Sequence, residues 1–197
     1  GKTVLDVCCA PGGKSFQLAD MGAILTSIDK SEKRLKLMRE SLARLNFDFE
    51  LINVDVFDYK PKKMYDVILL DPPCTATGTI GKNPDLQFLH PLDKLNELME
   101  IQQKMLDRCV DWLREDGSII YSVCSLLKEE GENQITKFLK NNNRFSALDP
   151  KNGDNLKAEG IEIQKDRGIR IMPFFEKKIG GTEGFYIAYL QAKGKNN

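Results

Sequence analysis

Two cysteines lie where side chains can do chemistry, because each directly follows an apolar segment that reads as a β-strand. Cys74 closes the run DPPC at 71–74, and Cys124 follows the segment 118–123. Two prolines fix the backbone and remove two N–H donors, so this run should hold Asp71 and Cys74 in place. If the two strands are neighbours, both thiols open into one crevice, where a thiolate could act as a nucleophile. The alternative is that the small side chains fill space near the core.

The other three cysteines have a simpler explanation. Cys109 falls on the apolar face of a predicted helix at 95–113, and Cys8 and Cys9 follow the first strand, so we expect all three to fill interior space. Five cysteines is an odd number, no CxxC pair is present, and His90 is the only histidine. This pattern argues against a disulfide framework and a metal site, and it favours a cytoplasmic location.

A glycine-bearing turn and an aspartate point to a nucleoside ligand. The turn APGGK at 10–14 follows the first predicted strand, and its glycines let the backbone approach a ligand with free N–H groups. Asp29 ends the second predicted strand, where an acid commonly binds ribose hydroxyls. The turn matches neither GxGxxG nor the P-loop pattern, so a phosphate cradle is not supported. A tight turn beside a helix-capping aspartate is the alternative.

Strand-like and helix-like segments alternate along the chain. The segments that read as strands are 3–7, 23–28, 49–54, 65–70, 118–123, 145–148 and 185–190. This alternation predicts an α/β fold, with a doubly wound, mostly parallel, seven-stranded sheet covered by helices on both faces. Residues 150–183 read as irregular or hairpin-like, which predicts that the last strand is antiparallel and lies near an edge. Ligands of such sheets bind outside the carboxyl ends of the strands.

The composition is that of one globular domain. The chain has 197 residues, of which 41% are hydrophobic and 29% charged, and it has no apolar run long enough to cross a membrane. Its 29 basic residues balance its 29 acidic residues. A protein that binds RNA tightly by itself usually carries a basic excess. The chain begins only two residues before its first predicted strand, which suggests a trimmed chain or a fragment of a longer protein.

Several segments resemble motifs of the RNA 5-methylcytosine methyltransferases, the family of the bacterial Sun/Fmu enzymes and the nucleolar NOL1/NOP2/Sun proteins. They occur in order along nearly the whole chain, at 6–14 (DVCCAPGGK), 71–74 (DPPC), 83–85 (NPD), 121–125 (YSVCS), 130–133 (EGEN) and 184–188 (GFYIA). Three departures stand out. Cys9 replaces a usual alanine, Glu183 a usual aspartate, and GTIGK at 78–82 replaces an arginine-rich segment that would contact RNA.

The resemblance implies a class I, Rossmann-like, S-adenosylmethionine-dependent methyltransferase, with residues 1–197 as one catalytic domain. It implies that Cys124 is the nucleophile that attacks C6 of the target cytosine, that Cys74 assists product release, and that Asp71 contacts the base. The cofactor site that it implies consists of Cys8, Cys9, Ala10, Pro11, Gly12, Gly13, Lys14, Asp29, Arg34, Asp55 and Asp71. We expect the helix start after Ser125 and the positive charge of the cofactor to lower the pKa of the Cys124 thiol.

The implied substrate is RNA. By resemblance to the bacterial enzymes we expect 16S rRNA, with tRNA as the alternative, and a monomer whose N-terminal RNA-binding region is absent from this chain. Two other classes compete. One is an amino-group methyltransferase, which places an aromatic residue where Cys74 stands. The other is a non-catalytic cofactor-binding module in ribosome assembly, against which the presence of Cys74, Cys124 and Asp71 argues.

Overall fold

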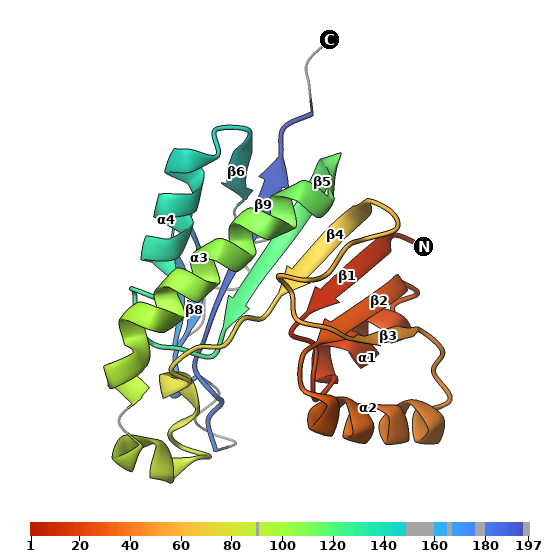
Figure 1. Cartoon of the computed structure of the whole chain (residues 1–197). Coiled ribbons are helices and arrows are strands. Elements are labelled where there is room, and N and C mark those ends of the chain that lie inside the picture. The colour runs from red at the N-terminus through yellow and green to blue at the C-terminus, as the bar shows by residue number, and fades with distance from the viewer. Residues whose placement is uncertain (90, 149–159, 165–166, 176–179, 195–197) are drawn as a thin grey trace.

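The computed structural model describes residues 1–89, 91–148, 160–164, 167–175 and 180–194, so His90 and much of 150–183 lie outside the described residues. The described strands join one sheet (Figure 1). They are β1 (Thr3–Val7), β2 (Ile24–Asp29), β3 (Glu50–Asn53), β4 (Tyr65–Leu70), β5 (Leu113–Val123), β6 (Phe145–Leu148), β7 (Ile161–Gln164), β8 (Gly168–Ile171) and β9 (Phe185–Ala192). The helices are α1 (Gly13–Asp20), α2 (Glu32–Leu45), α3 (Leu95–Trp112) and α4 (Glu132–Asn141), with short 3-10 helices η1 (Thr77–Thr79), η2 (Pro84–Phe88) and η3 (Pro91–Lys94).

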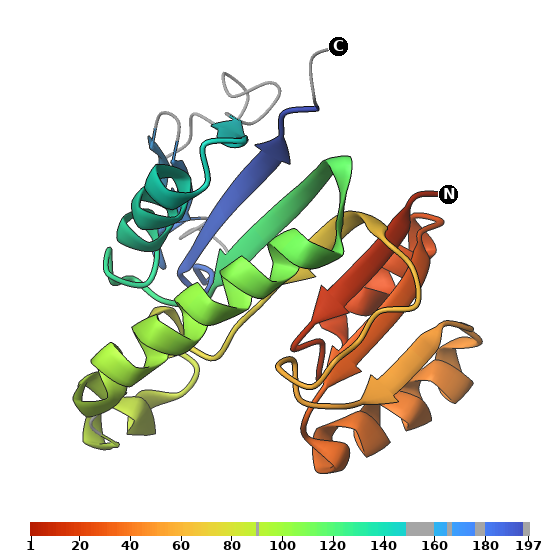
Figure 2. The same ribbon diagram turned by 45° about the horizontal axis from the view of Figure 1, so that its top comes forward.

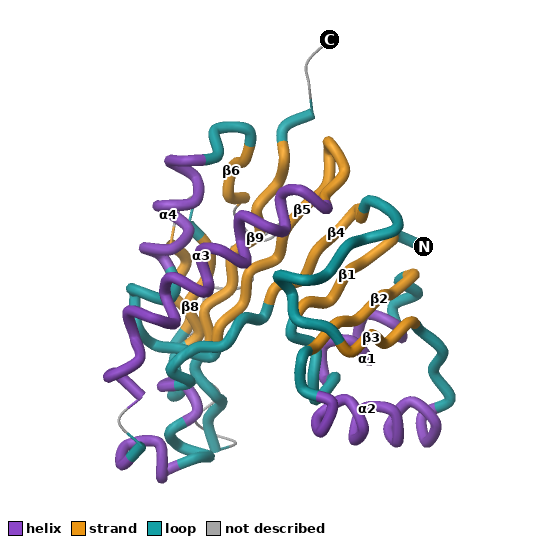
Figure 3. The backbone as a smooth tube through the Cα atoms, in the orientation of Figure 1, coloured by secondary structure: helices purple, strands orange, loops and turns teal. Residues whose placement is uncertain are grey.

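The first five strands form a doubly wound parallel sheet, as predicted. Their order is β3-β2-β1-β4-β5, so the chain starts in the middle, moves to one edge, and returns to continue on the other side. The direction of winding reverses between β1 and β4, which is where such sheets bind ligands. The loops after β1, β4 and β5 gather at the carboxyl ends of the strands (Figure 3). The predicted fold class is confirmed.

The antiparallel part of the sheet is larger than the sequence indicates. β9 runs antiparallel to β5, as predicted, but it does not lie at the edge, because β6 and β8 pair with its other side. β7 and β8 form an antiparallel pair within the segment that reads as hairpin-like. The described sheet therefore has nine strands rather than seven. The sequence does not predict β7 and β8 because each is only four residues long, which is too short for a clear alternating pattern.

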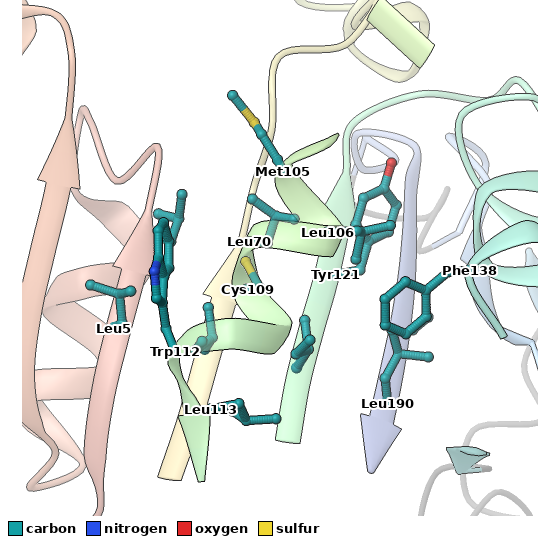
Figure 4. Close-up of a cluster of buried hydrophobic side chains, with 14 of the residues drawn as sticks. Leu5, Leu70, Met105, Leu106, Cys109, Trp112, Leu113, Tyr121, Phe138 and Leu190 are labelled. Atoms are coloured by element: carbon teal, nitrogen blue, oxygen red, sulfur yellow. The ribbon is translucent and has the colours of Figure 1, made fainter. Parts of the chain in front are cut away.

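Two hydrophobic clusters pack against the two faces of the sheet. On one face, α3 lies across the sheet (Figure 2). It places Leu106, Cys109 and Trp112 against β1, β4 and β5 (Figure 4). On the other face, α2 places Leu35 and Met38 against the turn that follows β1. The match between predicted and observed α3 reflects its apolar stripe, which recurs at helical spacing. No helix among the described residues is both long enough and apolar enough to span a membrane.

One helix begins later than its pattern indicates. The sequence predicts a helix from about residue 128, but residues 128–131 form a turn and α4 begins at Glu132. The turn is closed by the backbone N–H of Gly131, which donates to Lys128, and Gly131 itself leaves helical geometry at φ −110° and ψ −104°. The residues directly after Cys124 are therefore not the first turn of a helix.

Candidate active site

A cavity of about 260 Å³ opens at the carboxyl ends of the parallel strands, at the point where the winding reverses. Residues from the loops after β1, β2, β3, β4 and β5 line it. The site residues predicted from the sequence that meet there are Cys8, Ala10, Asp29, Arg34, Asp55, Asp71, Cys74 and Cys124. Residues far apart in the sequence are thus brought to one place by the topology of the sheet.

The two thiols face one another in this cavity. Cys74 Sγ lies 3.5 Å from Cys124 Sγ, and both side chains are partly exposed. A hydrogen bond from Cys74 lowers the pKa of the Cys124 thiol, although burial opposes the shift. The same hydrogen bond and burial raise the pKa of Cys74. Of the two thiols, Cys124 is therefore the one that ionises more readily, with Cys74 as its hydrogen-bond donor, and this donor takes the place of the helix start that we expected after Ser125.

Asp71 is paired with the lysine of the glycine-bearing turn. Lys14 Nζ lies 2.7 Å from Asp71 Oδ2, and its ammonium group also lies 5.6 Å from the centre of the Phe185 ring. Both partners of the ion pair are about one-third exposed, so it is open to a ligand. Lys14 does not line the cavity directly but holds Asp71 at its wall.

The Asp29 side chain stabilises the turn that follows β1. Its side chain is 1% exposed, and its carboxylate accepts hydrogen bonds from the backbone N–H groups of Ala10 at 3.1 Å and Ser31 at 2.8 Å. Arg34 donates to the same carboxylate at 3.1 Å and to the Ala10 carbonyl at 3.4 Å. Asp29 thus fixes the turn after β1 and the start of α2, in addition to lining the cavity.

The turn itself depends on Gly12. Its φ of +107° is one that residues with a Cβ rarely adopt, and a Cβ there would lie 2.8 Å from the Phe16 ring and 3.0 Å from Met38. Gly13 has open space around it. Cys9 turns away from the cavity, with its Sγ 3.8 Å from Met38 Sδ. The predicted residues Cys9, Pro11, Gly12, Gly13 and Lys14 therefore shape the turn but do not line the cavity.

Several lining residues escaped prediction, and five of the eight are apolar types that are common in a core. They are Ile28, Lys30, Val54, Val56, Pro72, Pro73, Ala76 and Met105. Ile28 and Val54 lie one residue before predicted polar residues, so proximity to Asp29 and Asp55 is the signal that could have found them. Met105 gives no such signal, since it belongs to the apolar stripe of α3. Within the described residues, no group of three or more histidine, cysteine or acidic side chains is placed to bind a metal ion.

A buried carboxyl group that does not line the cavity connects β1 to the first turn of α1. Asp6 is 1% exposed, it accepts a 2.5 Å hydrogen bond from the Ser15 hydroxyl, and its Oδ1 has no hydrogen-bond partner. Burial raises the pKa of Asp6 to about 7; the hydrogen bond from Ser15 opposes this shift, and the charge of Asp71 adds to it. Asp6 therefore changes its protonation state near neutral pH.

We expect Asp6→Asn to remove a pH dependence of stability. Because the folded pKa of about 7 lies above the unfolded value of 3.8, the folded state binds the proton more tightly. The contribution of Asp6 to the free energy of unfolding is then greatest below about pH 4 and falls by about 4 kcal/mol by pH 8. Asparagine has the same shape and does not ionise, so the variant should be more stable than the parent at high pH only. Urea denaturation at both pH values measures this, and an equal change at both would contradict it.

The fold and the lining of the cavity define a class I S-adenosylmethionine-dependent methyltransferase. The structure is similar to NSun6 from Pyrococcus horikoshii, solved with the S-adenosylmethionine analogue SFG, at a TM-score of 0.79 and 27% identity, covering 97% of this chain and 48% of that one. It is also similar to the crystal structure of PH0851, at a TM-score of 0.84 and 28% identity, covering 96% of this chain and 42% of that one.

Residues 1–191 match the family model described as 16S rRNA methyltransferase RsmB/F, and the chain belongs to this family. It is 35% identical to ribosomal RNA small subunit methyltransferase B of Pseudomonas syringae pv. tomato, over 96% of this chain and 42% of that protein. The chain therefore spans less than half the length of this curated relative. S-adenosylmethionine is the cofactor of the family, which confirms the cofactor predicted from the sequence.

Proposed function

We propose that this chain transfers a methyl group from S-adenosylmethionine to C5 of a cytosine in small-subunit ribosomal RNA, through a covalent bond between Cys124 and C6 of the base. The observation that carries the proposal is the thiol pair, in which Cys74 lies 3.5 Å from Cys124 and lowers its pKa. The family match supports RNA as the substrate class. Transfer to tRNA is the alternative.

The proposed chemistry requires a nucleophile because cytosine C5 alone is too weak to attack a sulfonium methyl group. Addition of the Cys124 thiolate to C6 forms an S–C bond and moves the ring electrons toward C5. Bound S-adenosylmethionine supplies the methyl group that C5 then accepts. Water then takes the C5 proton, and the electron pair of the C5–H bond restores the C5–C6 double bond. The S–C6 bond breaks at the same time, so Cys124 leaves as a thiolate that the hydrogen bond from Cys74 stabilises. The cytosine must be unpaired or flipped out to reach the thiol.

Asp71 and Lys14 have a supporting role in this proposal. Negative charge builds on the ring, toward N3, when Cys124 adds to C6. A partly exposed ion pair at the wall of the cavity offers a cation and a polar carboxyl group near that charge. We therefore assign Asp71 to contact the base and Lys14 to hold it in position.

The described cavity suits the cofactor. Apolar side chains of Ile28, Val54 and Val56 can cover an adenine ring, while the carboxylates of Asp29 and Asp55 can accept hydrogen bonds from ribose hydroxyls. Asp55 Oδ1 already accepts from the backbone N–H of Phe57, which fixes its orientation. These residues would hold the nucleoside part of S-adenosylmethionine.

We expect Asp29→Ala to weaken binding of S-adenosylmethionine by about 1–3 kcal/mol. The change leaves ligand hydroxyls unpaired and also frees the backbone N–H of Ala10. Titration calorimetry measures the affinity. Asp20→Ala removes an exposed aspartate outside the cavity and is the matched control, which should bind normally. Equal affinity of both variants would remove Asp29 from the site.

The proposed reaction is tested by transfer of labelled methyl groups. Small-subunit rRNA and tRNA from cells lacking the enzyme are incubated with the protein and methyl-labelled S-adenosylmethionine, and the RNA is digested to nucleosides. Label in 5-methylcytidine from rRNA is the expected result. Label on the exocyclic amino group would overturn the C5 chemistry, and label only in tRNA would overturn the substrate. Cofactor binding without any transfer would favour a non-catalytic module.

The partners follow from the same proposal. We assign residues 1–197 to a single catalytic domain that acts as a monomer, in the cytoplasm where ribosomal RNA is found. A net charge of zero provides few phosphate contacts and little counterion release. Tight binding of RNA would therefore draw on the part of the relatives' length that this chain does not span.

A further inference from the structure

A buried glutamate outside the cavity connects the loops that carry the two thiols. Glu130 is fully buried and does not line the cavity. Its carboxylate accepts hydrogen bonds from the Thr75 backbone N–H at 3.0 Å, the Thr75 hydroxyl at 2.5 Å and the Gln102 side-chain amide at 2.9 Å. A buried carboxylate is stable only when such donors satisfy it, so the three donors and Glu130 must keep their mutual positions.

Cys74 is held on both sides by this group. Thr75, the next residue, gives Glu130 both its backbone N–H and its hydroxyl. Pro73, the preceding residue, accepts a 3.0 Å hydrogen bond from the same Gln102 amide that donates to Glu130. The two neighbours of Cys74 therefore bind one buried pair, Glu130 and Gln102.

Cys124 is connected to the same carboxylate through a chain of hydroxyl groups. Ser125 Oγ lies 3.2 Å from Thr75 Oγ1 and 3.2 Å from Thr77 Oγ1. Because a carboxylate only accepts, the Thr75 hydroxyl must donate to Glu130, and Ser125 then donates to Thr75. The Tyr121 hydroxyl donates to the Glu130 carbonyl at 2.8 Å, which fixes the glutamate to the strand that ends before Cys124.

We infer that Glu130 is a positioning residue that fixes the position of the Cys74 sulfur relative to the Cys124 sulfur. Its charge orders the hydroxyls of Thr75 and Ser125 in one direction, and these residues are the immediate neighbours of the two thiols. The importance of this relative position for catalysis rests on the proposed function. The position of the two sulfurs is itself a property of the thiol pair, and its effect on thiol reactivity can be measured without RNA or cofactor.

The test compares Glu130→Gln with Glu129→Gln, which removes the same charge from an exposed side chain one residue away. Glutamine replaces one of the two carboxylate oxygens of Glu130 by an NH2 group, which is a donor and would face donors in this place. Two rates are measured in each folded protein: alkylation of Cys124 by iodoacetamide across pH, located by peptide mass spectrometry, and disulfide formation between Cys74 and Cys124 with diamide. In the second reaction two thiols lose two electrons and two protons, which diamide accepts.

We expect Glu130→Gln to slow alkylation of Cys124 near neutral pH by about tenfold, because its pKa returns toward that of an ordinary thiol. Disulfide formation should slow by about the same factor as the sulfurs lose their fixed approach. Glu129→Gln should match the parent in both rates. Unchanged rates in a folded Glu130→Gln protein would overturn the inference.

Thr75→Val keeps the test decisive if Glu130→Gln does not fold. Valine has nearly the same shape and retains the backbone N–H, but it cuts the hydroxyl chain between Glu130 and Ser125. We expect both rates to fall in Thr75→Val and to recover in Thr75→Ser, which keeps the hydroxyl. Parent-like rates in Thr75→Val would contradict the inference. A lack of methyl transfer by the parent would overturn the proposed function and leave these thiol measurements intact.

Discussion

Replacing Cys124 by alanine should abolish both methyl transfer and covalent capture of RNA, whereas replacing Cys74 should trap the protein on its substrate. Loss of a covalent nucleophile costs roughly 10⁴-fold or more in rate. In the proposed mechanism Cys74 is needed most after the methyl group has moved. Cys74→Ala loses the hydrogen bond that lowers the pKa of Cys124, so it should add to the base and methylate it more slowly, but it should still do both. Without the hydrogen bond at 3.5 Å, however, the Cys124 thiolate leaves slowly and an adduct accumulates.

A denaturing gel of each variant with RNA and S-adenosylmethionine separates the two roles. Cys9→Ala is the matched control, because Cys9 is a buried cysteine that packs on Met38 outside the cavity. It should keep activity and form no lasting adduct. An adduct with Cys124→Ala instead of Cys74→Ala would reverse the assignment. Full activity in both variants would exclude the covalent mechanism.

Gly78→Ala should distort the site, because the added Cβ would clash with backbone atoms. The N–H of Gly78 donates to the Cys124 carbonyl at 3.0 Å, and its carbonyl accepts from the Gly184 N–H at 2.8 Å. A Cβ on Gly78 would lie 2.7 Å from the Gly184 carbonyl carbon and 3.0 Å from the Cys124 oxygen. Backbone on both sides cannot move aside cheaply, so the strain falls on the backbone at Cys124, the proposed nucleophile.

We expect Gly78→Ala to lower the free energy of unfolding by about 3 kcal/mol, the upper end for overpacking. For a chain of this size that corresponds to a fall in Tm of roughly 6–12 °C. Gly81→Ala is the control, because Gly81 lies in the same loop and has no atom within 4 Å of its Cβ position. Thermal unfolding followed by circular dichroism compares them, and equal melting temperatures would disprove the predicted clash.

The parallel half of the fold and the location of the cavity could be predicted because both follow from strong local patterns. Strand β4 contains a continuous apolar run, and helix α3 has an apolar stripe at helical spacing. Polar residues follow the strands where the topology puts a ligand site. The β7–β8 pair lacked such a pattern. Arg170 of β8 is 3% exposed and forms a 2.5 Å ion pair with Glu132. These two residues are far apart in the sequence, so a local hydrophobic pattern cannot predict their contact.

The interior acids were the least predictable part of the candidate site. Charged side chains are usually exposed, so Glu130 and Glu132 read as polar residues at the start of a surface helix. Their burial depends on partners from distant segments, namely Thr75, Gln102 and Arg170. Asp29 also has a role that the sequence does not reveal. Its position at the end of a strand predicts a ligand contact, but not the hydrogen bond by which it stabilises the turn after β1.

The hydrogen bond from Arg170 to the loop after β5 also bears on when this loop can reach its final structure during protein synthesis. Arg170 donates to the Ser125 carbonyl at 3.0 Å from 45 residues further along the chain. At about 5–20 residues per second, the ribosome adds that arginine roughly 2–9 s after the serine. During this interval a nascent chain already carries Cys124 but not the strand that fixes the loop behind it. We therefore expect the loop that carries Cys124, the proposed nucleophile, to reach its final structure later than the parallel strands that precede it in the sequence.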